Sequence, residues 1–234
     1  MTRLTIKTLH DLIGITPDVP GYGHVFGARS KLALFAKLSN LKAPALTLDD
    51  YQRAATRLGI PIGHIKGVTK VEAPRGPYDD EGRPSILYER HKFRNNTEPK
   101  GRFNGSHPAI SGPAYGPGGY GSFGGQYDKF AAACALDPEA AFRACSWGAF
   151  QVLGENAVSL GYASAADMAF SLTTGVAAHL ETFVRFVEAN HLADELRECI
   201  PGDAKSCQPF VRVYNGPGFE FFKYDSKLAE AIKP

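Results

Sequence analysis

Residues 61–77 read PIGHIKGVTKVEAPRGP, and they carry the clearest local structural signal in the chain. Pro61 suits the first turn of a helix, where its missing N–H would have had no partner. Ile65, Val68 and Glu72 then recur at helical spacing, so the apolar stripe of this helix ends in a carboxylate. The two prolines among the next five residues stop the helix, because proline cannot continue its hydrogen bonds and restricts the residue before it.

Glu72 therefore occupies a position where the pKa of a carboxylate is raised. A side chain on an apolar stripe loses contact with water, and at the end of a helix it also faces the negative end of the helix dipole. Both effects disfavour the ionised form. A general acid that works near neutral pH needs such a raised pKa, and glycosidases obtain their acid in this way. The alternative is that Glu72 turns to solvent or pairs with Arg75.

The chain before this helix is also predicted to be helical. Thr47 and Asp50 form a capping-box pattern, and an apolar stripe follows up to Leu58. The first 40 residues predict a small unit with helices over 4–12 and 28–38. A unit of this size is too small to fold well alone, so we expect it to lean on the rest of the chain. The predicted domains are thus residues 1–40 and residues 44–234.

One strand and one long loop interrupt the helices farther along. Residues 84–93 alternate between two faces and predict a strand, with Glu89 and His91 on the same face. Residues 101–126 contain nine glycines, which is typical of a long functional loop. Helical patterns then continue towards the C-terminus. The sum is an α+β fold that is mostly α, with one small sheet.

Glu89 is the natural second carboxylate. Glycoside hydrolysis in most families needs one acid and one base or nucleophile that face each other across the sugar bond. A helix that ends at Glu72 beside a strand that carries Glu89 allows this geometry. The alternative for Glu89 is a salt bridge to a neighbouring Arg or Lys. For His91 the commoner role is that of an ordinary half-buried histidine.

Two short motifs have the chemistry of saccharide binding. Residues 146–151 read SWGAFQ and predict a small turn in front of a helix, with the only tryptophan of the chain beside it. Residues 214–218 read YNGPG and place a phenol and an amide on a tight turn. Aromatic faces stack on the apolar faces of sugar rings, while Gln and Asn side chains hydrogen-bond to hydroxyl and acetamido groups. Core packing and turn chemistry explain both motifs equally well.

Composition excludes several other classes of protein. The chain has 234 residues, of which 44% are hydrophobic, and a net charge of +2, which is too small to call for a nucleic acid partner. No stretch approaches the roughly 20 apolar residues of a membrane span, and residues 1–20 lack the apolar run of a signal peptide. The string GPGGYG over 116–121 is not a dinucleotide-binding motif, because no strand precedes it.

The cysteines and histidines lack the spacing of a metal site. Cys199 and Cys207 flank a turn-like segment, so they either form a disulfide in an oxidising compartment or stay reduced, and the sequence favours neither state. The sequence also leaves the state of Cys134 and Cys145 open.

Four strings, taken in order, carry a resemblance to a known family. They are VE at 71–72, ILYERHKF at 86–93, SWGAFQ at 146–151 and YNGPG at 214–218. With these strings, residues 44–234 resemble the N-acetylmuramidase domain of phage endolysins. More distantly, they are similar to goose-type lysozymes and soluble lytic transglycosylases, which share the lysozyme-like fold. The head, over residues 25–34, is similar to the end of a small three-helix peptidoglycan-binding module.

The resemblance implies a lysozyme-like muramidase that hydrolyses the β-1,4 bond between N-acetylmuramic acid and N-acetylglucosamine. It implies that Glu72 is the catalytic acid and that Glu89 is the candidate partner. The saccharide cleft would be formed by Ser146, Trp147, Gly148, Gln151, Tyr214 and Asn215, and we add His91 from the face that carries Glu89. A lytic transglycosylase, which needs only the acid, is the near alternative. A noncatalytic peptidoglycan-binding protein is the alternative from another class.

The expected partner is bacterial peptidoglycan, and the protein is expected to act as a monomer without a cofactor or a metal. In the absence of a signal peptide, it would be made in the cytoplasm of a bacterial host and would act on the cell wall in the periplasm after release.

Overall fold

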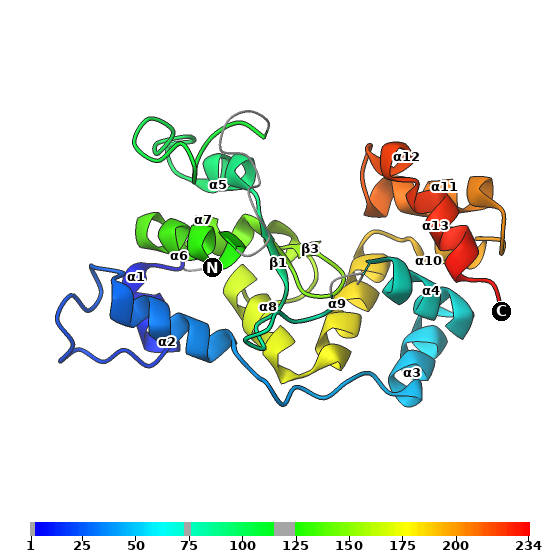
Figure 1. The fold of residues 1–234 in the computed structure, drawn as a ribbon, viewed down its shortest axis with the longest axis horizontal. Helices are drawn as coiled ribbons and strands as arrows, with labels where there is room; N and C mark the ends of the chain where they lie inside the picture. Colours follow the sequence, from blue (N-terminus) through cyan, green and yellow to red (C-terminus); the bar gives the residue numbers. More distant parts are fainter. Residues whose placement is uncertain (1–2, 73–75, 115–124) are drawn as a thin grey trace.

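Short helices surround one small antiparallel sheet (Figure 1). The structure is a computed structural model, and it describes residues 3–72, 76–114 and 125–234. The described α-helices are α1 (Ile6–Leu12), α2 (Ala28–Leu38), α3 (Leu48–Leu58), α4 (Ile62–Glu72), α5 (Arg90–Asn96), α6 (Gln126–Leu136), α7 (Pro138–Arg143), α8 (Ala165–Ser171), α9 (Val176–Ala189), α10 (Ala193–Arg197), α11 (Ala204–Tyr214), α12 (Phe219–Phe222) and α13 (Tyr224–Ala231). The strands are β1 (Ile86–Tyr88), β2 (Cys145–Trp147) and β3 (Val152–Leu153).

The helices α3 and α4 form where the sequence predicts them. Thr47 caps α3 in a reciprocal capping box with Asp50, and Gly59, at φ 65°, ends it in the left-handed conformation. The helix α4 starts after Pro61 and is described up to Glu72. Residues 73–75, which include the predicted helix stop and the alternative partner of Glu72, lie outside the described residues.

The N-terminal helices pack against the middle of the chain, as expected of a unit too small to stand alone. Lys31 of α2 forms an ion pair of 2.7 Å with Asp128 of α6. The rings of Phe35 and Tyr127 meet edge to face at 5.4 Å between centroids. Asn40 donates a hydrogen bond of 2.7 Å to the carbonyl of Thr173. These contacts place α2 beside α6 and α8 (Figure 1).

The strand expected over 84–93 is wrong in its second half. Only Ile86–Tyr88 pair with β2, and α5 begins at Arg90, so His91 lies on a helix. The amide of Phe93 donates to the carbonyl of Glu89, which closes the first helical turn. Phe93 is fully buried there. The alternation of side chains did not reveal this change, because a short strand followed by a helical turn buries the same apolar residues.

The segment 146–151 also differs from its prediction, because it forms a β-hairpin instead of preceding a helix. The hairpin joins β2 to β3 through a turn in which Gly148 has φ 70° and Gln151 has φ 48°. These left-handed conformations reverse the chain. In the register of the sheet, Leu87 pairs with Ser146 and Ser146 pairs with Leu153, so the polar Ser146 lies between two strands.

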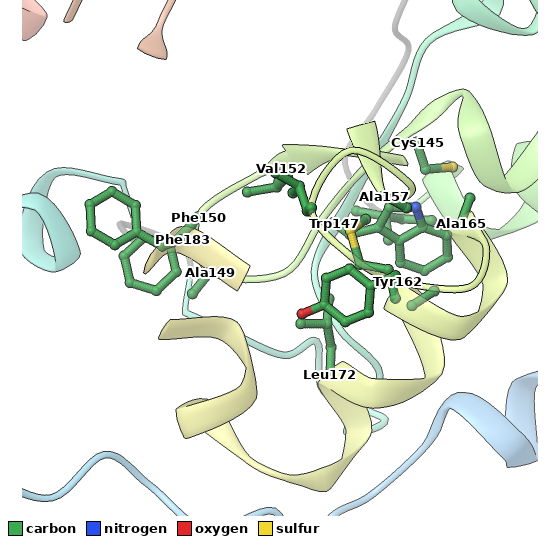
Figure 2. Close-up of a cluster of buried hydrophobic side chains, with 14 of the residues drawn as sticks. Cys145, Trp147, Ala149, Phe150, Val152, Ala157, Tyr162, Ala165, Leu172 and Phe183 are labelled. Atoms are coloured by element: carbon green, nitrogen blue, oxygen red, sulfur yellow. The ribbon is translucent and has the colours of Figure 1, made fainter. Parts of the chain in front are cut away.

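The opposite face of the sheet is buried in an aromatic core (Figure 2). Trp147 is 1% exposed, stacks on Phe142 at 5.6 Å and meets Phe130 edge to face at 5.3 Å. Its indole N–H donates a hydrogen bond of 3.0 Å to the carbonyl of Phe142, so its polar atom is satisfied inside the core. This packing fixes the hairpin from behind.

The cysteines Cys134, Cys145, Cys199 and Cys207 are buried free thiols. Cys199 and Cys207, which the sequence allowed to bridge, are not joined by a disulfide, and the thiol of Cys199 donates a hydrogen bond of 3.4 Å to the carbonyl of Glu195. Within the described ranges, none of the helices has the length and apolar character that crossing a membrane requires.

The close approach of α4 to α13 provides a test of the packing that holds Glu72. A Cβ atom added at Gly67 would lie 2.4 Å from Cγ2 of Ile232 and 3.2 Å from the backbone of Ala231. We therefore expect Gly67→Ala to lower the free energy of unfolding by about 1–3 kcal/mol, although alanine favours helices. Chemical denaturation measures this change.

Gly63 is the matched control on the same helix, because a Cβ atom added there meets nothing within 4 Å. Gly63→Ala should raise the free energy of unfolding by about 0.5–1 kcal/mol. Equal effects at the two positions would contradict a tight contact between α4 and α13.

Candidate active site

A cleft with a volume of about 860 Å³ lies between two groups of elements. One side consists of the end of α4 and the segment that follows α11, and the other consists of the sheet and the start of α5. In Figure 1 the sheet lies near the centre of the ribbon, with α4 and α11 to its right and α5 to its upper left. The cleft collects most of the residues singled out from the sequence, namely Glu72, Glu89, His91, Ser146, Gln151, Tyr214 and Asn215.

Glu72 is partly buried at the C-terminal end of α4, where it lines this cleft. Burial raises the pKa of Glu72 to about 7. A hydrogen bond of 2.9 Å from the side-chain N–H of Asn215 to Oε1 and the positive charge of Lys227 act in the opposite direction. The carboxyl group is therefore protonated in a large fraction of molecules at neutral pH.

Tyr214 fixes the position of Asn215. Its hydroxyl group donates a hydrogen bond of 2.8 Å to the carbonyl of Phe150 in the hairpin turn. Its ring stacks on Phe210 at 5.4 Å and meets Phe186 edge to face at 5.2 Å. Tyr214 is thus held by the protein on several sides, and the role of its ring is to position the segment after α11.

Asn215 also presents an unused acceptor. Its Oδ1 atom is buried and has no hydrogen-bond partner among the residues that the structure describes. A buried amide oxygen without a partner is costly, and a donor supplied by a bound ligand removes that cost. Hydroxyl and acetamido N–H groups are such donors.

Glu89 lies in polar surroundings, in contrast to Glu72. It precedes the first residue of α5, and its Oε1 atom accepts a hydrogen bond of 3.3 Å from the hydroxyl group of Ser146. The Nε2 atom of His91 lies 3.6 Å from its Oε2 atom. Glu89 and His91 lie close together, as the sequence predicted. The reason is different, because they stand at the start of a helix and not on one face of a strand.

Trp147 and Gly148 do not line the cleft, which corrects their expected place at the saccharide. Trp147 is buried in the core on the other face of the sheet, so its ring is not available for stacking on a sugar. Gly148 acts in the hairpin turn, where a Cβ atom would lie 2.5 Å from Nδ1 of His179. Gln151 lines the cleft and donates a hydrogen bond of 2.8 Å to the carbonyl of Gly148.

His179 is a positioning residue that sequence reasoning missed. Its Nδ1 atom accepts a hydrogen bond of 2.9 Å from the amide of Ala149, and its Nε2 atom lies 2.9 Å from the carbonyl of Leu172. Burial lowers the pKa of His179 to about 4, so it stays neutral and holds the hairpin turn. The available signal was its place between the apolar residues Ala178 and Leu180 in a predicted helix.

Tyr224, at the start of α13, is a second residue that sequence reasoning missed. It lines the cleft, and burial together with the charge of Glu72 raises the pKa of its hydroxyl group. No three His, Cys, Asp or Glu side chains gather as a metal site within residues 3–72, 76–114 and 125–234.

A mostly helical fold with a small sheet, and a cleft that holds a carboxyl group of raised pKa, are typical of a lysozyme-like glycoside hydrolase. The model of the N-acetylmuramidase family matches residues 61–234, and the chain belongs to this family. The crystal structure of the endolysin of Burkholderia AP3 phage is similar over 99% of this chain and 97% of that one, with a TM-score of 0.71 and 27% sequence identity. No curated protein matches the chain. The chain is therefore a peptidoglycan-hydrolysing enzyme of the endolysin type.

Because the pKa of Glu72 is raised, the difference in stability between the wild type and the Glu72→Gln variant should depend on pH. Glu72 keeps its proton up to about pH 7 in the folded protein but releases it near pH 4.5 when unfolded. The stability that this proton linkage contributes is complete below pH 4.5 and is lost as pH rises to 7. As pH rises from about 4 to 8, the free energy of unfolding of the Glu72→Gln variant should increase by up to about 3 kcal/mol relative to that of the wild type.

Denaturant titration of both proteins across this range measures the difference. The buried His179 acts in the opposite direction, because the stability that its lowered pKa contributes to the protein is lost as pH falls from 6.5 to about 4. Both proteins contain His179, so its contribution cancels in the difference. A difference that stays constant with pH would contradict the raised pKa.

Proposed function

We propose that this protein is a muramidase that hydrolyses the β-1,4 bond between N-acetylmuramic acid and N-acetylglucosamine, with Glu72 as general acid. The observation that carries this proposal is the position of Glu72 in the cleft with a pKa of about 7. A carboxyl group of this kind can give its proton to a leaving oxygen at neutral pH. Membership of the N-acetylmuramidase family and the similarity to a phage endolysin support the choice of substrate.

The first step breaks the glycosidic bond. Because Oε1 of Glu72 accepts the hydrogen bond from Asn215, the proton is carried by Oε2. Oε2 protonates the glycosidic oxygen as the bond from that oxygen to the anomeric carbon breaks. The bonding pair stays with the oxygen, so the leaving sugar departs as a neutral alcohol. The remaining sugar takes on the positive charge of an oxocarbenium-like state.

Glu89 serves the second half of the reaction. Its Oε1 atom accepts the hydrogen bond from Ser146, the imidazole of His91 lies 3.6 Å from its Oε2 atom, and all three residues line the same cleft. As a base, Glu89 takes a proton from water while the water oxygen bonds to the anomeric carbon. The product is a reducing sugar end. A lytic transglycosylase would not need this second carboxylate, so the presence of Glu89 in the cleft favours hydrolysis.

The enzyme is proposed to act as a monomer on the cell wall in the periplasm. Glu72 and Glu89 line one cleft within the same chain, so the reaction proposed above calls for no residue from a second copy.

Digestion of purified peptidoglycan followed by mass spectrometry tests the reaction. We expect reducing muramic acid ends from the wild type. Glu72→Gln should lower the rate by about 10²–10⁴, because the general acid is lost. Glu89→Gln should also reduce the rate substantially. Glu188→Gln is the matched control, since Glu188 pairs with Arg57 outside the cleft, and it should retain the wild-type rate.

Each proposed role can fail separately in this experiment. Anhydromuramic ends would assign the enzyme to the lytic transglycosylases. A full rate in Glu89→Gln would remove the second carboxylate from the mechanism. If the wild type binds peptidoglycan but releases no products, the protein is a noncatalytic wall-binding protein.

The hydrogen bond from Asn215 predicts the direction of a shift in the pH profile. Activity should fall above about pH 7 as Glu72 loses its proton. The N–H of Asn215 favours the ionised form, so Asn215→Ala should raise the pKa of Glu72 and move this alkaline limb to higher pH. The maximal rate should fall at the same time, because the carboxyl group is less well oriented. A limb that moves to lower pH would contradict this role.

A further inference from the structure

Two large aromatic rings are exposed beside one end of the cleft. Phe221 is 83% exposed and Phe222 is 54% exposed, and both belong to the short helix α12. Their rings meet edge to face at 5.0 Å between centroids. Single exposed apolar residues are ordinary, but adjacent exposed apolar rings form a patch of the kind that marks an interaction site.

The two rings continue the lining of the cleft. The helix α12 lies between two segments that line it, Gly216–Gly218 before the helix and Tyr224 after it. The Cε2 atom of Phe222 would lie 3.7 Å from a Cβ atom at Gly218. The ring of Phe222 also lies 6.0 Å from that of Tyr224. Tyr224, Phe222 and Phe221 thus form a continuous series of rings that leads outward from the cleft, which we call the aromatic lip.

We propose that the aromatic lip is a distal saccharide subsite that binds the glycan strand outside the catalytic part of the cleft. This inference rests on the proposed function, because it takes the same polysaccharide as its ligand. Each sugar ring of a β-1,4-linked strand has an apolar face of C–H groups that can stack on an aromatic ring. The ligand is a polymer, so it extends beyond the sugars that Glu72 and Glu89 contact.

A membrane surface explains the lip less well. Exposed Glu220 and exposed Lys223 flank the two rings on either side, so the local charge does not attract an anionic lipid surface. The amide of Phe222 donates a hydrogen bond of 3.3 Å to the carbonyl of Gly218, which ties the lip to a residue that lines the cleft. Continuity with the cleft therefore favours the glycan as the occupant.

A distal subsite contributes to binding of long substrates and little to short ones. We expect the double substitution Phe221→Ser and Phe222→Ser to lower kcat/KM on insoluble peptidoglycan roughly ten-fold, mainly through KM. On a soluble tetrasaccharide of the same repeat, the loss should stay below about two-fold. The double substitution Phe221→Tyr and Phe222→Tyr keeps both rings and should restore activity on the long substrate.

Leu41→Ser is the matched control for a polar residue at an exposed apolar site. Leu41 is 77% exposed and lies between α2 and α3, away from the residues that line the cleft. Leu41→Ser should leave kcat/KM unchanged on both substrates. Circular dichroism of all variants establishes that they are folded, and the single variant Phe221→Ser, at the more exposed position, repeats the test with the least disturbance.

Binding without cleavage separates this inference from the proposed function. In a Glu72→Gln background, the serine double variant should sediment with purified sacculi about ten-fold less well than the background alone. Equal sedimentation would overturn the subsite. Binding to vesicles of phosphatidylglycerol tests the membrane alternative. If the serine double variant loses vesicle binding but binds sacculi unchanged, the lip is a membrane-binding site and the proposed subsite is wrong.

A failure of the proposed function gives a different pattern. Suppose that the wild type releases no muropeptides while the serine double variant still loses binding to sacculi. The lip is then supported as a glycan-binding site, and the catalytic proposal is wrong. If the wild type cleaves peptidoglycan and the serine variant loses neither binding nor KM, only the lip fails.

Discussion

The site depends on keeping the carboxyl group of Glu72 in a position with little water at the end of α4. Burial raises its pKa to about 7, and the single hydrogen bond from Asn215 limits this rise. The two effects leave a group that exists in both protonation states near neutral pH. Such a group can give up a proton and accept one again within a catalytic cycle. The surrounding elements serve to maintain this position.

The cleft is held in shape by side chains that bond to the backbone of a turn. Tyr214 donates to the carbonyl of Phe150, and His179 accepts from the amide of Ala149. Both bonds reach the turn between β2 and β3, one from the end of α11 and one from α9. From behind, Trp147 packs into the aromatic core (Figure 2). A turn that is held on three sides keeps the cleft residues beside it in one arrangement.

Local signals in the sequence predicted the helices around Glu72 and the burial of its carboxyl group, but not the details of the sheet. The capping box at Thr47 and the apolar stripe that ends at Glu72 depend on neighbours within a few residues, so they can be recognised from the chain itself. The strand over 84–93 was predicted too long, because the burial of Phe93 is decided by distant packing. Trp147 suits a sugar and a core equally well, and only the fold brings the rings of its core partners to it.

The two carboxylates lie in surroundings that belong to different parts of the fold. Glu72 is held by the segment after α11, whereas Glu89 contacts Ser146 on the hairpin side. An acid and a base on two separate groups of elements can work together only if those groups keep a constant separation. The hydrogen bond from Tyr214 to the carbonyl of Phe150 joins them directly, because one residue adjoins Asn215 and the other lies in the hairpin. This bond therefore couples the position of Glu72 to that of Glu89.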